Sequence, residues 1–528
     1  MYESIKTIKS VLLRAALLAA FVFSLFAYED ELVPNPNVQR TFVIAGALSD
    51  PDLNPRTSTY SNEAQILNAL YEGLFSYDPR TLDPIPAIAS DYKIARNKKS
   101  WTFTIRDEAK FSDGTPITAE TIRQSWLDLQ KTTDAQYASL LDIITNMKEF
   151  REGKVAQDEV GIKASGNKLI LDLNHPAAHL PRILCHHSFA AFNGDTNVFS
   201  GAFALKQKST DRLVLEKNAN YWDADNVILN EICVLFSEDE ADNTWMFNTG
   251  RVDWVPARFS IDKLLNKNSI RISALFGTTY LFFTCRNKPW DSADLRRALV
   301  CAVPWDKIRA GVLIQADSLV YPISGYPEPE GLSDTDEEEA LFLIKKAKKA
   351  AGIDENAVLE LTFGIADSEY MRNQAMILQE AWKPLGVKLN IQTTPDSRYL
   401  ASIPSWDADI FSYSWIGDFA DPLAFLELFR EGSTLNQTVW KNEEFTKLLE
   451  EADEETNDER RNNLLSQAEQ VLLDDGMIMP VAHSVSLHAI DLQTIGGWYI
   501  NALDIHPFKY LYFKDTDPSA MRNVAREH

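Results

Sequence analysis

The residue types most able to do chemistry gather in one short stretch of the chain. They are His175, His179, Cys185, His186 and His187. Imidazole and thiolate groups at such spacings can ligate a soft or borderline metal ion. However, Pro176 interrupts any helix that would align the first two histidines, and Leu180, Ile183 and Leu184 indicate a packed segment. We therefore predict neither a metal site nor a cofactor.

Other catalytic signatures are missing from the sequence. There is no GxSxG elbow, no HExxH, no phosphate-binding GxxxxGK[ST] and no GxGxxG after a strand. Their absence shifts the expectation from catalysis toward binding, so we predict a protein that is not an enzyme.

Length and charge narrow the class further. The 528 residues, of which 45% are hydrophobic, are enough for two or three packed domains. The net charge of −24 argues against a nucleic-acid partner, because phosphate contacts require a basic face. Like charge also suppresses self-association, so we expect a monomer.

The first 27 residues have the pattern of an export signal. Lys6, Lys9 and Arg14 precede the apolar run 15–26, which is too short to span a bilayer and ends at Ala27. We predict a signal peptide over residues 1–27 and a periplasmic protein. The segment has no cysteine for a lipid anchor. An uncleaved anchor is the alternative.

The cysteines are widely spaced along the chain. They are Cys185, Cys233, Cys285 and Cys301, with no CxxC pair. In an exported protein they could form up to two disulfides. Cys233 and Cys301 lie in apolar runs and could equally be small buried residues.

The N-terminal third reads as a small mixed α/β module over residues 64–188. A strand is predicted at 101–107, where apolar and polar residues alternate, and another at 168–173. Between them Asp113 and Gly114 form a turn, and Thr118 caps a helix that carries Ile122 and Trp126 on one face.

The clearest strand–helix–strand unit lies further along. Alternating apolar residues predict a strand over 359–365, a helix follows around 367–385, and Gly386 leads to a strand at 387–392. A unit of this length implies parallel pairing and a right-handed crossover. The fold class expected is therefore α/β.

With these elements in place, the chain resembles a known family. The stretch WTFTIRDEAKFSDGTPITAETIRQSW, at residues 101–126, resembles the signature of the bacterial extracellular solute-binding proteins of the oligopeptide/dipeptide class. Similar motifs continue through NALYEGLF near residue 70, LEKNANYWD, FNTGRVD, RNKPWDSADLRRAL and WIGDFADPLAFLELF. The resemblance covers nearly the whole chain after residue 27.

The resemblance implies a type II-like periplasmic binding fold, in which two lobes joined by a two-strand hinge close around a ligand. On that view residues 28–63, 189–275 and 485–520 form lobe I, and residues 64–188 form an additional small domain. Residues 276–484 form the other lobe, lobe III. The ligand would be captured from the periplasm and delivered to the membrane permease of an ABC transporter.

The resemblance also implies a ligand site for peptides. An aspartate after a tryptophan binds the peptide's ammonium group in the family, and Asp418 matches it here. The strand segments that would flank the peptide match Thr59, Tyr60 and Ser61 on one side and Ser414, Trp415, Ile416 and Gly417 on the other, with Tyr280 as a further candidate. A charge-assisted bond to an ammonium is about twice as strong as a neutral one.

Some positions depart from the family pattern. The chain is short between Phe192 and Gly201, carries Ser412 where some members have a basic residue, and reads Thr394-Pro395-Asp396 where a pocket tryptophan is common. A sugar, a metal chelate or another non-peptide solute is therefore the alternative ligand, and a peptide-binding chaperone or a hydrolase is the alternative of another class.

Overall fold

The structure is a computed structural model that describes residues 40–47, 51–58 and 61–514. The predicted signal segment lies outside this range. Within it, no helix combines the length and the apolar character needed to cross a membrane.

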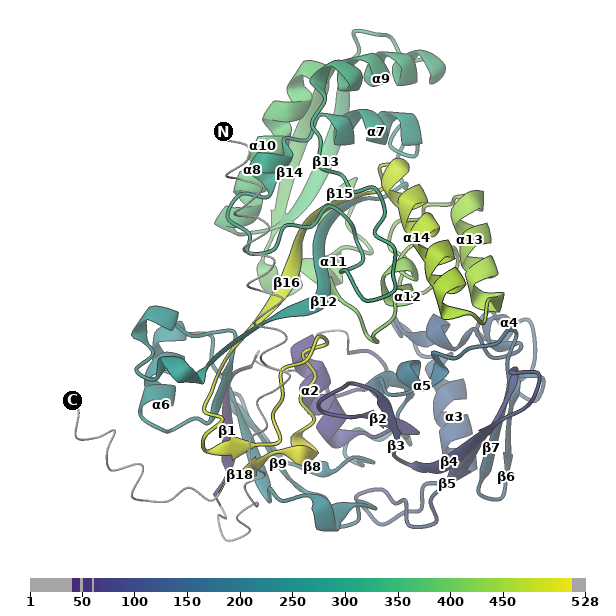
Figure 1. The fold of residues 1–528 in the computed structure, drawn as a ribbon, viewed down its shortest axis with the longest axis vertical. Helices are drawn as coiled ribbons and strands as arrows, with labels where there is room; N and C mark the ends of the chain where they lie inside the picture. Colours follow the sequence, from purple (N-terminus) through teal and green to yellow (C-terminus); the bar gives the residue numbers. More distant parts are fainter. Residues whose placement is uncertain (1–39, 48–50, 59–60, 515–528) are drawn as a thin grey trace.

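One ten-stranded mixed sheet runs through the molecule (Figure 1). Its strand order is β14-β13-β15-β12-β16-β11-β1-β10-β9-β8. In that order the strands span Val387–Thr394, Leu359–Ala366, Ile410–Ile416, Ile270–Phe283, Ile478–Ile490, Trp254–Pro256, Phe42–Ala47, Glu231–Phe236, Arg212–Lys217 and Phe203–Lys208.

The two longest strands, β12 and β16, join the two halves of this sheet. They pair antiparallel from Ile270↔Ala489 to Phe282↔Ile478, with irregular register between Ala274 and Tyr280. At one end β16 continues the sheet to β11, and at the other β12 continues it to β15 (Figure 1). The expected α/β architecture with a two-strand connection is confirmed, and the strands of both halves form one continuous sheet.

The predicted strand–helix–strand unit is confirmed in the upper half of Figure 1. β13 and β14 pair in parallel from Leu359↔Val387 to Ala366↔Thr394, and α10 (Glu369–Trp382) connects them. Gly386 adopts a φ of +70° between the helix and β14, a conformation that glycine reaches without a Cβ penalty. Trp382 is fully buried and donates its indole N–H to the Leu299 carbonyl at 2.9 Å.

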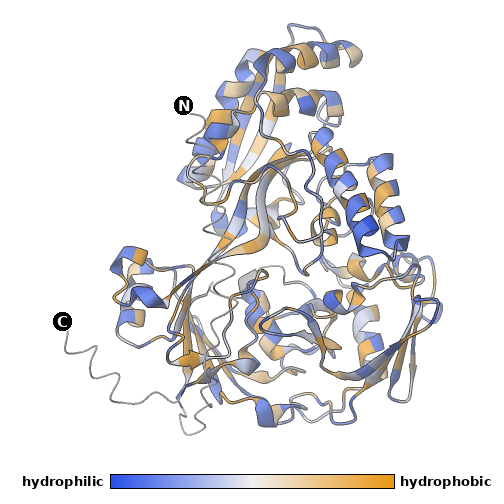
Figure 2. Ribbon diagram, in the orientation of Figure 1, coloured by the Kyte–Doolittle hydropathy of each residue, from blue (hydrophilic) through white to orange (hydrophobic). Residues whose placement is uncertain are grey.

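The small module has its own antiparallel sheet with the order β4-β5-β7-β6. Its strands span Ala89–Ile94, Ser100–Ile105, Lys168–Asp172 and Ile162–Ser165. The Thr118 side chain accepts a hydrogen bond from Thr121 N and caps α3 (Ala119–Leu129) as predicted. Apolar residues of α3, including Ile122 and Trp126, are buried against the sheet, and Figure 2 shows the hydropathy alternating along these elements.

The remaining elements surround these sheets. The other helices are α2 (Ser61–Leu70), α4 (Met147–Arg151), α5 (Leu180–Ile183), α6 (Glu240–Asn248), α7 (Ala293–Cys301), α8 (Trp305–Ile308), α9 (Glu337–Ala350), α11 (Asp396–Ser402), α12 (Leu423–Leu426), α13 (Glu443–Glu454) and α14 (Asp458–Asp474). Two short pairs, β2 (Phe75–Tyr77) with β3 (Pro84–Pro86) and β17 (Ile495–Gly496) with β18 (Tyr512–Phe513), complete the strands. All four cysteines are free thiols, so neither of the two possible disulfides forms.

The expected borders between the lobes fall inside continuous elements. Residues 275 and 276 lie within β12, and residues 484 and 485 lie within β16. The division into residues 28–63, 189–275 and 485–520, residues 64–188, and residues 276–484 stays our proposal.

A buried carboxylate in α14 secures the long connection between α8 and α9. Glu469 Oε1 accepts hydrogen bonds from Leu319 N at 2.6 Å and Val320 N at 2.9 Å, and Tyr326 Oη donates to Oε2 at 2.6 Å. Burial raises the pKa of Glu469 to about 7, against the lowering effect of these hydrogen bonds.

This contact gives a stability prediction. Glu469→Leu should lower the unfolding free energy by about 2–5 kcal/mol, because two buried backbone N–H groups lose their acceptor at about 1–3 kcal/mol each. Glu469→Gln keeps an acceptor oxygen for both N–H groups and should cost about 1 kcal/mol or less. Urea unfolding followed by circular dichroism measures both, and equal losses would contradict the acceptor role.

Candidate functional site

The far edge of β15 offers unpaired backbone groups at its C-terminal end. Gly417 N donates to Phe276 O at 2.8 Å, and the register opposes Ile416 to Gly277 and Ser414 to Thr279. In an antiparallel ladder this makes Ser414 and Ile416 members of non-hydrogen-bonded pairs, so their N–H and C=O groups point away from β12. On that side the only strand pairing of β15 among the described residues is with β13, at Ile410 and Phe411. The edge at 414–416 can therefore accept another strand.

Asp418 follows this edge directly and lies under the small module. Its carbonyl accepts a hydrogen bond from Tyr77 Oη at 3.2 Å, and its carboxylate Oδ1 is 3.8 Å from His186 Nε2. The Tyr137 hydroxyl hydrogen-bonds the carboxyl group. Only 11% of the Asp418 side chain is exposed. One carboxyl group is thus surrounded by side chains that come from three separate segments of the small module.

The electrostatics of this carboxyl group are unusual. Burial raises the pKa of Asp418 to about 8, and the hydrogen bond from Tyr137 opposes the rise only in part. Burial and the neighbouring His187 hold the pKa of His186 well below its ordinary value, so this imidazole is neutral at pH 7. In the described part of the chain no Lys or Arg forms an ion pair with Asp418. The site is therefore a buried acid without a countercharge.

Aromatic rings form one wall beside Asp418. Trp415 is buried, donates its indole N–H to the Ala424 carbonyl at 3.0 Å and stacks on Tyr413 at 5.9 Å between ring centroids. Tyr137 approaches Trp415 to 6.5 Å and His186 to 4.2 Å. These contacts fix the orientation of the tyrosine that hydrogen-bonds the acid.

The predicted site residues fall into three groups. The structure brings Ser414, Trp415, Ile416, Gly417 and Asp418 together at the end of β15. Thr59 and Tyr60 lie outside the described residues, and Ser61 is the first residue of α2.

Tyr280 is placed in the core. Its side chain is 2% exposed and packs against Phe282, Tyr413 and Phe429, with ring centroids 6.0–6.3 Å apart. In this structure Tyr280 packs in the core, and its contact with a ligand stays a prediction.

Sequence reasoning missed Tyr77, Tyr137 and His186 as neighbours of Asp418. They lie more than 230 residues before it, and the first two stand in segments with no chemical signature. The histidine cluster was the one available signal, but its residues separate. His175 faces Asp453 at 4.0 Å, His179 stacks on Phe419, and the Cys185 thiol donates to the Pro181 carbonyl.

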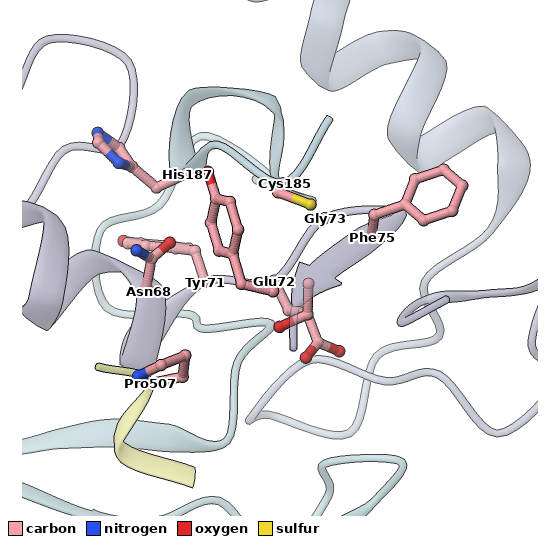
Figure 3. A pocket seen from close by; sticks show the side chains of 10 residues that line it. Asn68, Tyr71, Glu72, Gly73, Phe75, Cys185, His187 and Pro507 are labelled. Carbon is pink, nitrogen blue, oxygen red and sulfur yellow. The ribbon is translucent and has the colours of Figure 1, made fainter. Parts of the chain in front are cut away.

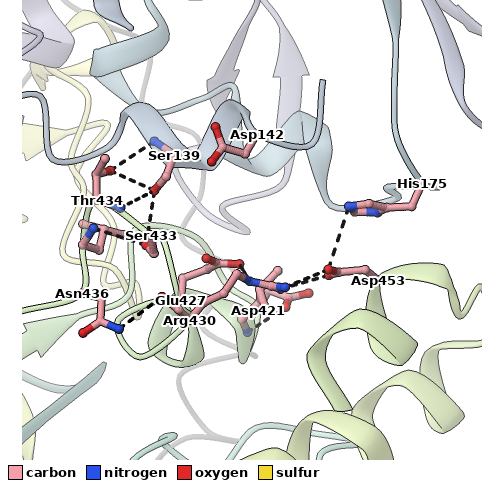
Figure 4. Close-up of polar contacts among 12 residues, drawn as sticks. Ser139, Asp142, His175, Asp421, Glu427, Arg430, Ser433, Thr434, Asn436 and Asp453 are labelled. Carbon is pink, nitrogen blue, oxygen red and sulfur yellow. Dashed lines mark hydrogen bonds and ion pairs between the residues drawn. The ribbon is translucent and has the colours of Figure 1, made fainter. Parts of the chain in front are cut away.

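Polar contacts hold the small module against the residues that follow β15 (Figure 4). Ser139 N donates to Thr434 Oγ1 at 3.2 Å, and Thr434 N donates to Ser139 Oγ at 3.0 Å. Arg430 binds Glu427 at 2.7 Å and Asp453 at 3.0 Å, next to His175. These contacts join the small module to residues 427–453 of the other half.

A small polar cavity, shown in Figure 3, lies next to this region and shares Tyr77 in its lining. It is lined by Asn68, Tyr71, Glu72, Gly73, Phe75, Ser76, Tyr77, Cys185, His187 and Pro507. Both ring nitrogens of His187 and the hydroxyl of Tyr71 are buried without a hydrogen-bond partner among the described residues. Burial lowers the pKa of His187 to about 4, so this imidazole adds polarity but no charge beside His186.

One cluster has the composition of a metal site. His488, Asp504 and His506 place three potential ligand atoms within 4.8 Å of one another. Trp254 Nε1, which can only donate, lies 3.2 Å from His488 Nδ1. Nδ1 is therefore the acceptor, and the proton sits on Nε2, which donates to Asp504 at 2.8 Å. A metal would need this nitrogen unprotonated, so the contacts of Trp254 fit a hydrogen-bonded cluster and not a metal centre.

Two long strands that join the halves of one sheet, an open strand edge and a buried acid are the features to compare with known proteins. Residues 83–437 match the family model described as bacterial extracellular solute-binding proteins, family 5. This match covers more than half of the 528 residues. The chain belongs to this family, whose members are extracellular or periplasmic.

Individual relatives agree over most of the chain. It is 29% identical over 465 residues to the oligopeptide-binding protein OppA of Bacillus subtilis, covering 81% of this chain and 85% of that protein. It is 27% identical over 486 residues to the dipeptide-binding protein DppE of the same organism, covering 86% and 87%. The structure of the murein tripeptide-binding protein MppA of Escherichia coli superposes with a TM-score of 0.80 at 24% identity, covering 92% of this chain and all of that one.

The raised pKa of Asp418 predicts a pH-dependent stability difference. A carboxyl group whose pKa is about 8 when folded and about 3.8 when unfolded takes up a proton on folding between these pH values, so stability is unaffected below pH 4 and is lost progressively as the pH rises to 8. The loss of stability has an upper bound of about 6 kcal/mol. Asp418→Asn cannot ionise and should therefore melt at a higher temperature than wild type, by an amount that grows from pH 5 to pH 8.5. Calorimetry of the ligand-free proteins measures this, and a difference independent of pH would contradict a buried neutral acid.

Proposed function

We propose that the protein captures peptides by their backbone and their amino terminus and delivers them to the permease of an ABC transporter. The observation that carries the proposal is Asp418, a buried carboxyl group without a countercharge at the end of an open strand edge. The names of the relatives, which are oligopeptide- and dipeptide-binding proteins, support the ligand class.

The strand edge suits the part of a peptide that is common to all sequences. The outward N–H and C=O groups of Ser414 and Ile416 can pair with a peptide lying as an added strand. Thr59, Tyr60 and Ser61 would flank the peptide on its other side. Recognition through backbone groups leaves the peptide's side chains free to vary.

Asp418 suits the peptide's amino terminus. A buried carboxylate gains from a cation that hydrogen-bonds it, and a peptide ammonium brings a charge and three donors. The Tyr137 hydroxyl hydrogen-bonds the Asp418 carboxyl group, and Tyr77 orients the Asp418 carbonyl. The Tyr137 oxygen and the Asp418 carbonyl oxygen are therefore close enough to accept hydrogen bonds from the same ammonium group. We therefore assign Asp418 as the ammonium-binding residue, with Tyr137 beside it.

The surrounding properties of the protein follow from the same proposal. We infer that residues 1–27 direct export and that the mature protein acts in the periplasm as a monomer. It binds and releases its ligand without chemical change, because no nucleophile with an activating base lies beside Asp418 among the described residues. A related protein of Haemophilus influenzae has been solved in complex with the peptide RPPGFSPFR.

Removal of the carboxylate should weaken peptide binding strongly. Asp418→Asn should lower the affinity for an unmodified tripeptide or tetrapeptide by about 2–5 kcal/mol, or roughly thirtyfold to several-thousandfold, because the ammonium would be buried unpaired. Isothermal titration calorimetry measures this loss. Asp421→Asn is unsuitable as a control because Arg461 depends on Asp421, whereas exposed Asp396→Asn is a matched control and should bind like wild type.

N-acetylated peptides separate this role from general damage to the site. Acetylation removes the ammonium group. Wild type should therefore lose about as much affinity on acetylation of the peptide as it loses for the free peptide on the change to Asp418→Asn. The variant should bind the acetylated and the free peptide with nearly equal affinity. Additive losses would mean that Asp418 does not contact the amino terminus. Wild-type protein that binds no peptide but retains a non-peptide solute would overturn the proposal as a whole.

Peptide binding should also release a proton. Below pH 8 the acid of the ligand-free protein is largely protonated, and the arriving ammonium favours the ionised form. Calorimetry at pH 6.5 in buffers of different ionisation enthalpy should report about one proton released per peptide, and affinity should rise up to tenfold per pH unit toward pH 8. Asp418→Asn should release none, and proton uptake by wild type would contradict the assignment.

A further inference from the structure

A shallow groove lies at the outer edge of the same half of the sheet, beside β14. β14 is the outermost strand, two strands away from β15, and it pairs only with β13 among the described strands. The groove runs between the end of β14 and the segment from α11 to Trp406, is open to solvent and has a volume of about 560 Å³. It is lined by Gln392, Thr393, Thr394, Ser402, Ser405 and Trp406.

The lining is neutral although the chain is highly charged. None of the six residues carries a charge, whereas 24% of the whole chain does. The exposed charged neighbours Asp396, Arg398 and Asp407 are not part of the lining. A ligand for this groove therefore needs many hydrogen bonds and no charge.

The hydrogen-bonding groups in the groove are oriented in advance. Trp406 Nε1 donates to Gln392 Oε1 at 2.7 Å, which turns the amide nitrogen of Gln392 and its two donors away from the indole. The Ser402 hydroxyl donates to Arg398 O at 2.8 Å and keeps its lone pairs for an incoming donor. Thr393 is exposed, and its hydroxyl group can both donate and accept, whereas the exposed Ser405 hydroxyl donates to Ser402 O at 3.4 Å and can accept.

The Trp406 ring is held in one orientation. Phe411 and Tyr399 meet it at 5.7 and 6.3 Å between ring centroids, with interplanar angles of 60° and 79°. Tyr399 is itself fixed, because its hydroxyl donates to Ser412 O and accepts from Ser412 N. The indole therefore presents a rigid apolar surface beside neutral hydroxyl and amide groups.

We propose that this groove binds a neutral oligosaccharide. A sugar ring has an apolar face of C–H groups that packs on an indole, and a rim of hydroxyl groups that pair with Gln, Ser and Thr side chains. A purely apolar ligand would leave these polar groups without partners, and an anionic or cationic ligand would find no countercharge. The groove is separate from Asp418, so it can be occupied together with the peptide site.

The experiment uses three neutral probes, which are chitotriose, maltotriose and cellotriose, in calorimetric or saturation-transfer NMR titrations of the full chain. At least one should bind wild type in the millimolar range or tighter, and Trp406→Ala should weaken it about tenfold or more. Thr393→Arg, at an exposed position of the groove, should weaken the same probe without touching the core. Trp245→Ala removes an exposed tryptophan of α6, outside the groove, and should leave binding unchanged.

Two further results decide the assignment. Asp418→Asn should keep the sugar affinity of wild type, and Trp406→Ala should keep its peptide affinity, since the sites lie on different strands. Failure of all three probes at 10 mM, or equal binding by Thr393→Arg and wild type, would overturn the sugar site and leave the peptide proposal standing. Loss of sugar binding in Asp418→Asn would place the sugar in the peptide cleft.

Discussion

The antiparallel pairing of β12 with β16 is the constraint on which the rest of the molecule depends. Each strand is long enough to take part in both halves of the sheet, so the two halves cannot be positioned independently. The register shifts twice, between Ala274 and Thr278 and between Thr279 and Tyr280, and Gly277 lies in the first of these shifts. A Cβ at Gly277 would meet Trp415 O at 3.0 Å and Ile416 Cγ1 at 3.1 Å. The irregular segment therefore needs glycine where β12 approaches β15 most closely, and any relative movement of the halves must be absorbed there.

The same register decides which groups of β15 remain available. Because Gly417 N is committed to Phe276 O, alternate residues of the strand turn their backbone groups outward at Ser414 and Ile416. The chain then leaves the sheet at Gly417, whose missing side chain leaves room for the Phe276 ring. Because the chain leaves the sheet at this point, Asp418 lies beneath Tyr77, Tyr137 and His186. One hydrogen-bond pattern thus sets both the edge for a peptide backbone and the place of the acid.

Local patterns in the sequence predicted local structure well. The alternation in 359–365, the Thr118 cap and Gly386 each correspond to an interaction among near neighbours, and the structure confirms them. The neighbours of Asp418 could not be predicted in this way, since they depend on how the small module packs on the other half. Periodicity also did not predict that Tyr280 is buried in the core. When both faces of a sheet are covered, residues on both faces are buried, so the alternation of a strand does not show which side chains are accessible.

Asp418 and Asp421 show what residue types alone could not distinguish, because Asp418 was named through the family resemblance and not through its chemistry. The two residues are three apart, and the side chains of both are largely buried. Burial alone would raise the pKa of Asp421, but Arg461 binds it through two hydrogen bonds of 2.8 and 3.0 Å and lowers the pKa overall. That carboxylate is already satisfied and gains nothing from a further cation. Asp418 has only neutral partners, so its ionised form is unfavourable unless a cationic ligand stabilises it. The two acids differ in their partners, which come from residues 137 and 186 for Asp418 and from residue 461 for Asp421. This difference supports our proposal that Asp418 binds the ligand, whereas Asp421 is held in a structural ion pair.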